Sequence, residues 1–279
     1  MNKIKIALCQ MNVIDNKDEN IKKAISMIKT SKDNGADLAI LPEMFNCPYE
    51  NEKFIEYGEE LEKSKTLKEI SKIAKDEEIH IVAGSIPERE IIDNQEYLYN
   101  SSVFFNDKGE ILGKHRKMHL FDIDVKDKIY FKESDTLSPG NNFTVIDTKF
   151  GKIGIGICYD VRFVELSRIM ALNGAKILIF PGAFNLTTGP AHWKTLFKSR
   201  ALDNQVFAIG VAPALDKSAN YNSYGHSIVV SPWGEPIEEL GYDEELKIVE
   251  IDLDEIERVR EEIPVLKNRR TDLYEINQK

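Results

Sequence analysis

The stretch of this chain that most limits the possible fold runs from residue 152 to residue 185. Lys152–Ile157 (KIGIGI) alternates isoleucine with glycine, which is typical of a buried strand with another element packed close to it. Val161–Leu172 then shows mostly helical spacing of its apolar residues and stops at an Asn-Gly pair. Lys176–Phe180 (KILIF) is the next strand. Strand, helix and strand in such close succession indicate an α/β fold.

Cys158 stands at the turn between the first strand and the helix of this unit. Such a turn can lift a side chain clear of a sheet, with backbone N–H groups of the following helix beside it. Those N–H groups favour the thiolate, so we expect a reactive thiol. The same position is also compatible with a cysteine that only fills the core, because free cysteines are commonly buried.

Composition narrows the class of protein and its compartment. The 279 residues carry a formal net charge of −10, which argues against binding nucleic acid or an anionic membrane surface. The sparse, odd set of cysteines (Cys9, Cys47 and Cys158) is not a disulfide framework and fits a reducing compartment. No run is apolar enough for a signal peptide or a membrane span, so we expect a cytoplasmic protein. The glycosylation-type triplets at Asn100 and Asn185 are therefore expected to be idle.

The remaining pattern predicts more alternating elements. Successive strands also occur in pairs, at 79–84 then 99–105 and at 205–211 then 225–231, which favours a two-layer sheet core with helices outside over a plain doubly wound sheet. We expect further strands at 4–9, 38–41, 111–114, 143–147 and 247–253, and helices at 18–32, 66–76, 192–204 and 254–262.

Two charged side chains follow predicted strands, and a third lies in a long polar segment. Glu43 comes directly after the strand at 38–41, at the edge where open α/β sheets bind ligands, although a solvated glutamate fits there too. Lys117 lies in the basic run after the hairpin at 99–114, which by itself is typical of a solvated turn. Segment 122–138 is polar, contains Glu133, and is expected to be an irregular functional loop.

Several chemistries do not fit these residues. The Gly154-Ile155-Gly156 run fails the dinucleotide fingerprint, whose third glycine would fall at Tyr159, and neither GxxxxGK[ST] nor HExxH occurs. His115 and His119 are four residues apart, but their segment is not clearly helical, so we expect no metal. A Glu–Lys–Cys grouping remains open: a buried carboxylate can accept a thiol proton, and an ammonium stabilises thiolate and oxyanion. Spacing alone does not establish that grouping.

Sequence motifs reveal a resemblance that spans essentially the whole chain. Leu41-Pro-Glu43, His115-Arg-Lys117 and Gly156-Ile-Cys158-Tyr-Asp160 occur in the order typical of the carbon–nitrogen hydrolase (nitrilase) superfamily. The chain also resembles the omega-amidase branch of that superfamily, and the stretch at 181–193 is its most telling mark. The matching stretches are FNCPYE (45–50), KHRKMHLFDIDV (114–125), FKESDTLSPG (131–140), GICYDVRFVEL (156–166), PGAFNLTTGPAHW (181–193), DNQVFAIG (203–210) and RRTDLY (269–274).

The resemblance implies a fold, an assembly and a set of roles. It implies a single αββα sandwich domain over residues 1–279 and a homodimer, with the tail 263–279 on the partner subunit. Among the site residues, the resemblance implies a nucleophilic thiol, a general base, an oxyanion-stabilising ammonium, a second glutamate that orients substrate and lysine, and a backbone N–H in the oxyanion hole. In that order these are Cys158, Glu43, Lys117, Glu133 and Tyr159. It implies no cofactor.

The implied substrate is a small amide. Members of this branch hydrolyse the terminal amide of short dicarboxylic acid monoamides, chiefly 2-oxoglutaramate and 2-oxosuccinamate. The far carboxylate of such a substrate needs a donor, for which the candidates are Tyr49, Arg162, Thr187, Thr188 and His192. Two alternatives stay open, namely an amidase for deaminated glutathione or N-carbamoyl amines, and a binding module that keeps the fold without the chemistry.

Overall fold

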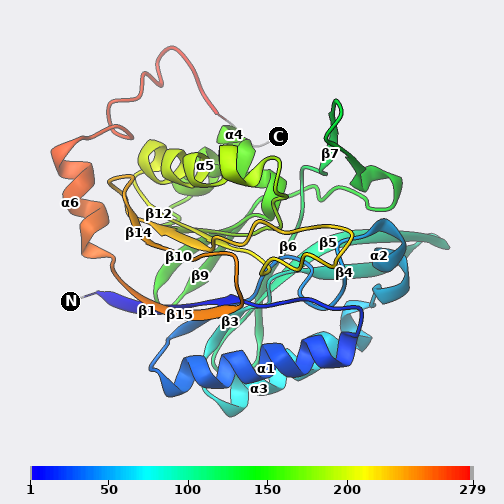
Figure 1. The fold of residues 1–279 in the computed structure, drawn as a ribbon. Helices are drawn as coiled ribbons and strands as arrows, with labels where there is room; N and C mark the ends of the chain where they lie inside the picture. Colours follow the sequence, from blue (N-terminus) through cyan, green and yellow to red (C-terminus); the bar gives the residue numbers. More distant parts are fainter. Residues whose placement is uncertain (1, 277–279) are drawn as a thin grey trace.

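Two β-sheets packed face to face form the centre of the molecule, and helices cover both outer faces. The computed structural model describes residues 2–276. Figure 1 shows α1 (Lys17–Asp33) and α3 (Lys65–Asp76) against one sheet and α4 (Val164–Leu172) and α5 (Gly189–Asn204) against the other. These four layers are the predicted αββα sandwich.

The first sheet combines both ends of the chain. Its strands lie in the order β15-β1-β2-β3-β5-β4, and β6 also pairs with β5. The central strands β1, β2 and β3 are parallel, whereas β15 pairs antiparallel with β1. The bounds are β1 Lys3–Gln10, β2 Leu38–Ile40, β3 His80–Val82, β4 Ile86–Ile92, β5 Gln95–Phe105, β6 Ile111–Arg116 and β15 Glu245–Asp252.

The second sheet is built from the predicted strand–helix–strand unit and its neighbours. Its order is β14-β13-β12-β11-β10-β9, with β10, β11 and β12 parallel. The bounds are β9 Thr144–Thr148, β10 Gly151–Ile155, β11 Ile177–Pro181, β12 Phe207–Val211, β13 Ile228–Val230 and β14 Pro236–Glu239. The parallel strands end at the same edge, so the turns after β10 and β11 lie side by side.

Successive side chains of a strand point to opposite faces of its sheet and therefore pack into different apolar cores. Ile6 and Leu8 of β1 pack into the core between the sheets, whereas Ala7 and Cys9 pack toward α1 and α3. On the other side, Phe180 of β11 packs into a core with residues of α4 and α5. This period-two alternation is what sheets covered on both faces require. Cys9 lies in the core beneath α1 and α3, which supports a purely structural role for this residue.

The predicted strands and helices are present, with small shifts at their ends, but two strands and one α-helix outside segment 122–138 were missed. These are β4, β14 and the short helix α2 (Asn51–Tyr57). β4 contains Pro87 and charged side chains, so its strand pattern is weak, and it forms because β5 pairs with it along its whole length. The helix predicted at 161–172 is broken: a 3-10 turn, η3 (Cys158–Arg162), precedes α4.

Segment 122–138 is not irregular, so that expectation was wrong. Strands β7 (Asp122–Val125) and β8 (Ile129–Lys132) form a hairpin, and the 3-10 turn η2 (Glu133–Asp135) follows it. A second short turn, η1 (Leu61–Lys63), lies between α2 and α3. Polar residues dominate this hairpin because it stands apart from both large sheets, as Figure 1 shows for β7.

Helix α6 (Asp254–Glu262) and the tail end the described chain. Beyond α6 the tail continues through turns, and its apolar Leu273 and Tyr274 are exposed. Residues 277–279 of the predicted partner-binding tail lie outside the described residues. Between residues 2 and 276, no helix is both long and apolar enough to cross a membrane.

Gly84 provides a test of how tightly the strand ends are packed. It has a left-handed φ of +39°, and an added Cβ would lie 2.0 Å from the Pro42 carbonyl oxygen. We expect Gly84→Ala to lower the free energy of unfolding by about 2–4 kcal/mol through backbone strain and overpacking, as measured by urea unfolding. Gly241→Ala is the matched control, because nothing lies within 4 Å of its Cβ position; equal losses would contradict the prediction.

Candidate active site

Cys158 is held in a strained turn at the carboxyl end of β10. It has a left-handed φ of +47° and is the first residue of η3. Its side chain is almost fully buried. Gly182, which follows β11, comes so close that an added Cβ would lie 3.1 Å from the Cys158 Cα. Strained backbone of this kind persists only where surrounding contacts fix it, and it is common at reactive side chains.

Glu43 is fully buried beyond β2 and accepts hydrogen bonds on both carboxylate oxygens. The Asn100 side-chain amide and the Lys117 ammonium donate to Oε1 over 2.8 and 3.0 Å. The backbone N–H of Ala183, from the second sheet, donates to Oε2 over 2.7 Å. Burial raises the pKa of the Glu43 carboxyl above its ordinary value, and the charge of Lys117 opposes that shift. The carboxylate is therefore a base of increased strength in a fixed position.

Lys117 lies at the centre of the site, so the solvated-turn interpretation of its segment was wrong. Its ammonium is fully buried and pairs with Glu43 at 3.0 Å and with Glu133 at 2.8 Å. Burial acts to lower the pKa of Lys117, but the charges of Glu133 and Glu43 outweigh it and hold that pKa well above its usual value. The side chain is therefore a permanent buried cation.

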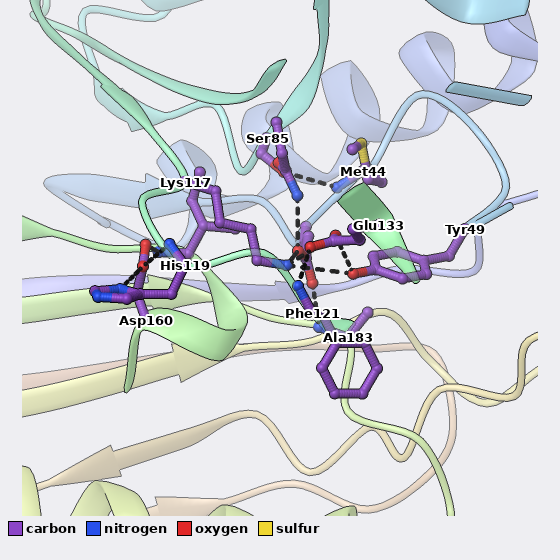
Figure 2. A network of polar contacts seen from close by, with 12 residues as sticks. Met44, Tyr49, Ser85, Lys117, His119, Phe121, Glu133, Asp160 and Ala183 are labelled. Atoms are coloured by element: carbon purple, nitrogen blue, oxygen red, sulfur yellow. Dashed lines mark hydrogen bonds and ion pairs between the residues drawn. The ribbon is translucent and has the colours of Figure 1, made fainter. Parts of the chain in front are cut away.

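Glu133 and Tyr49 complete this network. The Tyr49 hydroxyl donates to Glu133 Oε1 over 2.6 Å, and the backbone N–H of Phe121 donates to Oε2 over 2.6 Å. Figure 2 shows Tyr49, Lys117 and Glu133 converging on one point. The Tyr49 hydroxyl is thus engaged by Glu133, and its role as a donor for substrate stays a prediction.

The surroundings of Cys158 favour the protonated thiol over the thiolate, which opposes the effect expected from the helix N–H groups. Burial, followed by the charge of Glu43, raises the pKa of the Cys158 thiol well above its ordinary value, although Lys117 opposes the shift. The sequence shows the turn but not the carboxylate that packs beside it. A thiol next to a strong buried base can react only by giving up its proton to that base.

Arg162 and the other predicted substrate ligands lie around this centre. Arg162 stacks over the rings of Tyr159 and Phe184, and its Nη1 donates to His192 Nδ1 over 3.2 Å. Its buried Nε has no hydrogen-bond partner within residues 2–276. Thr187 and Thr188 are oriented by their backbone N–H groups, both of which donate to Asn185 Oδ1.

Sequence reasoning missed three side chains of the site. Asn100 positions Glu43, although the sequence singled it out only as an idle glycosylation triplet. The Tyr221 hydroxyl donates to the Ala183 carbonyl over 2.6 Å, and its ring packs on Tyr49. Asp160 accepts hydrogen bonds from two histidines, His115 and His119. Neither the polar loop of Tyr221 nor the spacing of Asn100 carries a recognisable signal.

A small cavity reaches the general area of Glu43. It has a volume of about 50 Å³, and Glu43, Tyr49, Ala183 and Tyr221 are among its lining residues. A cavity of this size that is lined in part by polar side chains has room for water. Water can therefore approach the carboxylate without passing through the packed cores.

Comparison with known proteins identifies the family. The family model for carbon–nitrogen hydrolases matches residues 5–261. This chain belongs to the carbon–nitrogen hydrolase family. It is 47% identical to omega-amidase NIT2-A of Xenopus laevis over 100% of this chain and 99% of that protein, and 45% identical to omega-amidase NIT2 of Homo sapiens over the same shares. The fold matches the crystal structure of Saccharomyces cerevisiae Nit3, a member of branch 10 of the nitrilase superfamily. The TM-score is 0.88 at 41% identity, covering 96% of this chain and 97% of that one.

The buried base next to Cys158 leads to a prediction about thiol reactivity. We expect iodoacetamide to alkylate Cys158 near neutral pH much faster than Cys9 or Cys47, because the Glu43 carboxylate beside Cys158 can accept the thiol proton as the sulfur reacts. Burial raises the pKa of all three thiols, but within the described residues neither Cys9 nor Cys47 has a carboxylate as a hydrogen-bond partner. Peptide mass spectrometry of partly labelled protein measures the three rates, and Glu43→Gln should slow only that of Cys158. Equally slow labelling at all three sites would contradict a thiol activated by Glu43.

Proposed function

We propose that this protein is an omega-amidase, which hydrolyses the terminal amide of short dicarboxylic acid monoamides to the acid and ammonia. The 2-oxo compounds 2-oxoglutaramate and 2-oxosuccinamate are the proposed substrates. The observation that carries the proposal is the buried Glu43–Lys117–Glu133 cluster beside Cys158. The full-length similarity to omega-amidases of Xenopus laevis and Homo sapiens supports the same activity.

In the first proposed step, Cys158 attacks the amide carbon. Glu43 accepts the thiol proton, and the sulfur forms a bond to the carbonyl carbon, giving a tetrahedral oxyanion. Lys117 and the backbone N–H of Tyr159 are the proposed donors to that oxyanion. Tyr159 is the second residue of η3, and N–H groups in the first turn of a helix have no acceptor within the helix. The Lys117 charge is already in place, so no reorganisation is needed.

In the second half of the proposed reaction, the intermediate collapses and is hydrolysed. Glu43 returns the proton to the departing nitrogen, the C–N bond breaks, and ammonia leaves a thioester on Cys158. A water molecule then gives a proton to Glu43 and attacks the thioester carbon. The C–S bond breaks, the acid leaves, and Glu43 returns its proton to the sulfur, which restores the Cys158 thiol. Glu133 holds the Lys117 ammonium in place throughout, over 2.8 Å.

Arg162 is the proposed donor to the far carboxylate of the substrate. Within residues 2–276 Arg162 has no carboxylate partner, and its Nε is buried without a hydrogen-bond partner. Its pKa is lowered by burial and raised in turn by the neighbouring Cys158 and Tyr159, so the guanidinium lies near the nucleophile. An unpaired guanidinium close to the reacting group suits a dianionic product. Thr187, Thr188 and His192 stay as further candidates beside it.

The substrate proposal is tested by ammonia release from a small panel of compounds. We expect turnover of 2-oxoglutaramate and 2-oxosuccinamate, with little from glutamine, N-carbamoylputrescine, deaminated glutathione or a simple nitrile. Cys158→Ala should abolish turnover because the sulfur is the proposed nucleophile. Activity confined to another panel member would reject the substrate but keep the cysteine chemistry. Silence on the whole panel, together with slow alkylation of Cys158, would favour a non-catalytic module.

The role of Arg162 is tested by separating binding from chemistry. We expect Arg162→Gln to raise KM for 2-oxoglutaramate about 10- to 100-fold, which corresponds to the loss of one charge-assisted contact. The value of kcat should change much less, since the guanidinium is not a donor to the oxyanion. Lys198→Gln on the exposed side of α5 is the control for charge alone. An unchanged KM in Arg162→Gln would assign the carboxylate to another donor.

We propose that the protein is a homodimer in which the tail packs on the partner subunit. Exposed apolar side chains support this, namely Val164 and Leu172 on α4 and Leu273 and Tyr274 in the tail. Light scattering should give about twice the chain mass of 31.9 kDa, and removal of residues 263–279 should shift it toward the monomer. A monomeric mass for the intact protein would contradict the proposal.

We also propose a cytoplasmic location, which the three free thiols support.

A further inference from the structure

Asp160 connects the two segments that carry the reactive groups. Its carboxylate is fully buried and lies between the turn of Cys158 and the segment that contains Lys117. Oδ2 accepts hydrogen bonds from His115 Nε2 and from the backbone N–H of Ile157, each over 3.0 Å. Oδ1 accepts from the backbone N–H of His119 over 3.0 Å and from its Nδ1 over 2.7 Å. Figure 2 shows Asp160 and His119 facing each other beside Lys117.

The groups that donate hydrogen bonds to Asp160 lie close to Lys117 and to Cys158 along the chain. His115 and His119 lie two residues before and two residues after Lys117, so both sides of the lysine are tied to one group. Ile157 precedes Cys158, and Asp160 itself follows it by two residues, so the strained turn is held from both sides as well. The first sheet carries Lys117 and the second sheet carries Cys158, and this carboxylate spans the gap between them.

The ionised state of Asp160 is maintained at a cost. Burial alone raises the pKa of a carboxyl, but the hydrogen bonds from His115 and His119 outweigh burial and hold the pKa of Asp160 below its ordinary value. A buried carboxylate is expensive unless every lone pair is satisfied, and apolar residues of similar size are often no less stable. A gain in folding stability therefore gives little reason for a charged side chain at this position. The need to hold the surrounding groups in fixed positions does give one.

We propose that Asp160 is a positioning residue, which sets the relative placement of the Cys158 sulfur and the Lys117 ammonium through His115, His119 and the Ile157 N–H. This inference rests on the proposed cysteine chemistry but not on the identity of the amide. Asp160 touches neither the thiol nor the ammonium directly. Its contribution is to keep two groups from different sheets within reach of the same carbonyl oxygen, where a displacement of about 1 Å can cost on the order of 100-fold in rate.

The test compares Asp160→Asn with a carboxylate variant of the same burial elsewhere. An asparagine keeps the size of the side chain but turns one acceptor into a donor, which faces the donors already present. We expect kcat to fall on the order of 100-fold on whichever panel amide is hydrolysed, with KM changed less than threefold. Glu88→Gln is the matched control, since Glu88 is equally buried and accepts from Ser101, Lys114 and Arg116. It should lose stability but keep its kcat.

Two further measurements keep the outcome decisive. His119→Ala, at a partly exposed position, removes one donor and should lower kcat about 10-fold at unchanged KM, even if Asp160→Asn does not fold. The alkylation rate of Cys158 needs no substrate, so it should fall in both variants even if the substrate proposal is wrong. The inference is overturned if both variants keep kcat and the alkylation rate within twofold while their melting temperatures fall as in Glu88→Gln. It is also overturned if KM alone rises.

Discussion

The active centre depends on one buried cation that is shared by two glutamates. Lys117 is fully buried, and removing it would leave Glu43 and Glu133 as buried charges without an ion-pair partner. The arrangement also sets the strength of the base. Burial raises the pKa of Glu43 while Lys117 restrains it, so the carboxylate is ionisable and strongly basic at the same time. Burial and the charge of Glu43, by contrast, raise the pKa of the Cys158 thiol.

Both sheets contribute to this centre, and that division explains its rigidity. Glu43 follows β2 and Lys117 follows β6 in the first sheet, while Cys158 and Ala183 follow β10 and β11 in the second. The Ala183 N–H donates to Glu43 across this divide over 2.7 Å. Packing of the core between the sheets therefore fixes the distances between Glu43, Lys117 and Cys158, each of which follows closely after a strand.

The sequence predicts some strands and site residues of this protein well and others not at all. Strands such as β1 and β11 were predicted because their side chains alternate or are apolar throughout, whereas β4 needed its partner β5 to become a strand. Glu43, Lys117 and Cys158 were found through motifs. Asn100 was not, and Asp160 lay in a motif without a predicted role, since their partners Glu43 and His115 lie 57 and 45 residues away and only folding brings them together. The effect of Glu43 on the Cys158 thiol was not predicted from the turn alone for the same reason.

The pairing of β1 with β15 has a consequence for how this protein matures. Residues 3–10 and 245–252 are adjacent along eight paired positions, with β1 placed between β15 and β2. During synthesis the ribosome produces β1 more than 230 residues before β15. Until β15 has been made, β1 has one open side, which is a template for pairing with another chain. The nascent polypeptide therefore carries an unpaired strand edge over this whole interval of translation, and the pairing of β1 with β15 closes it.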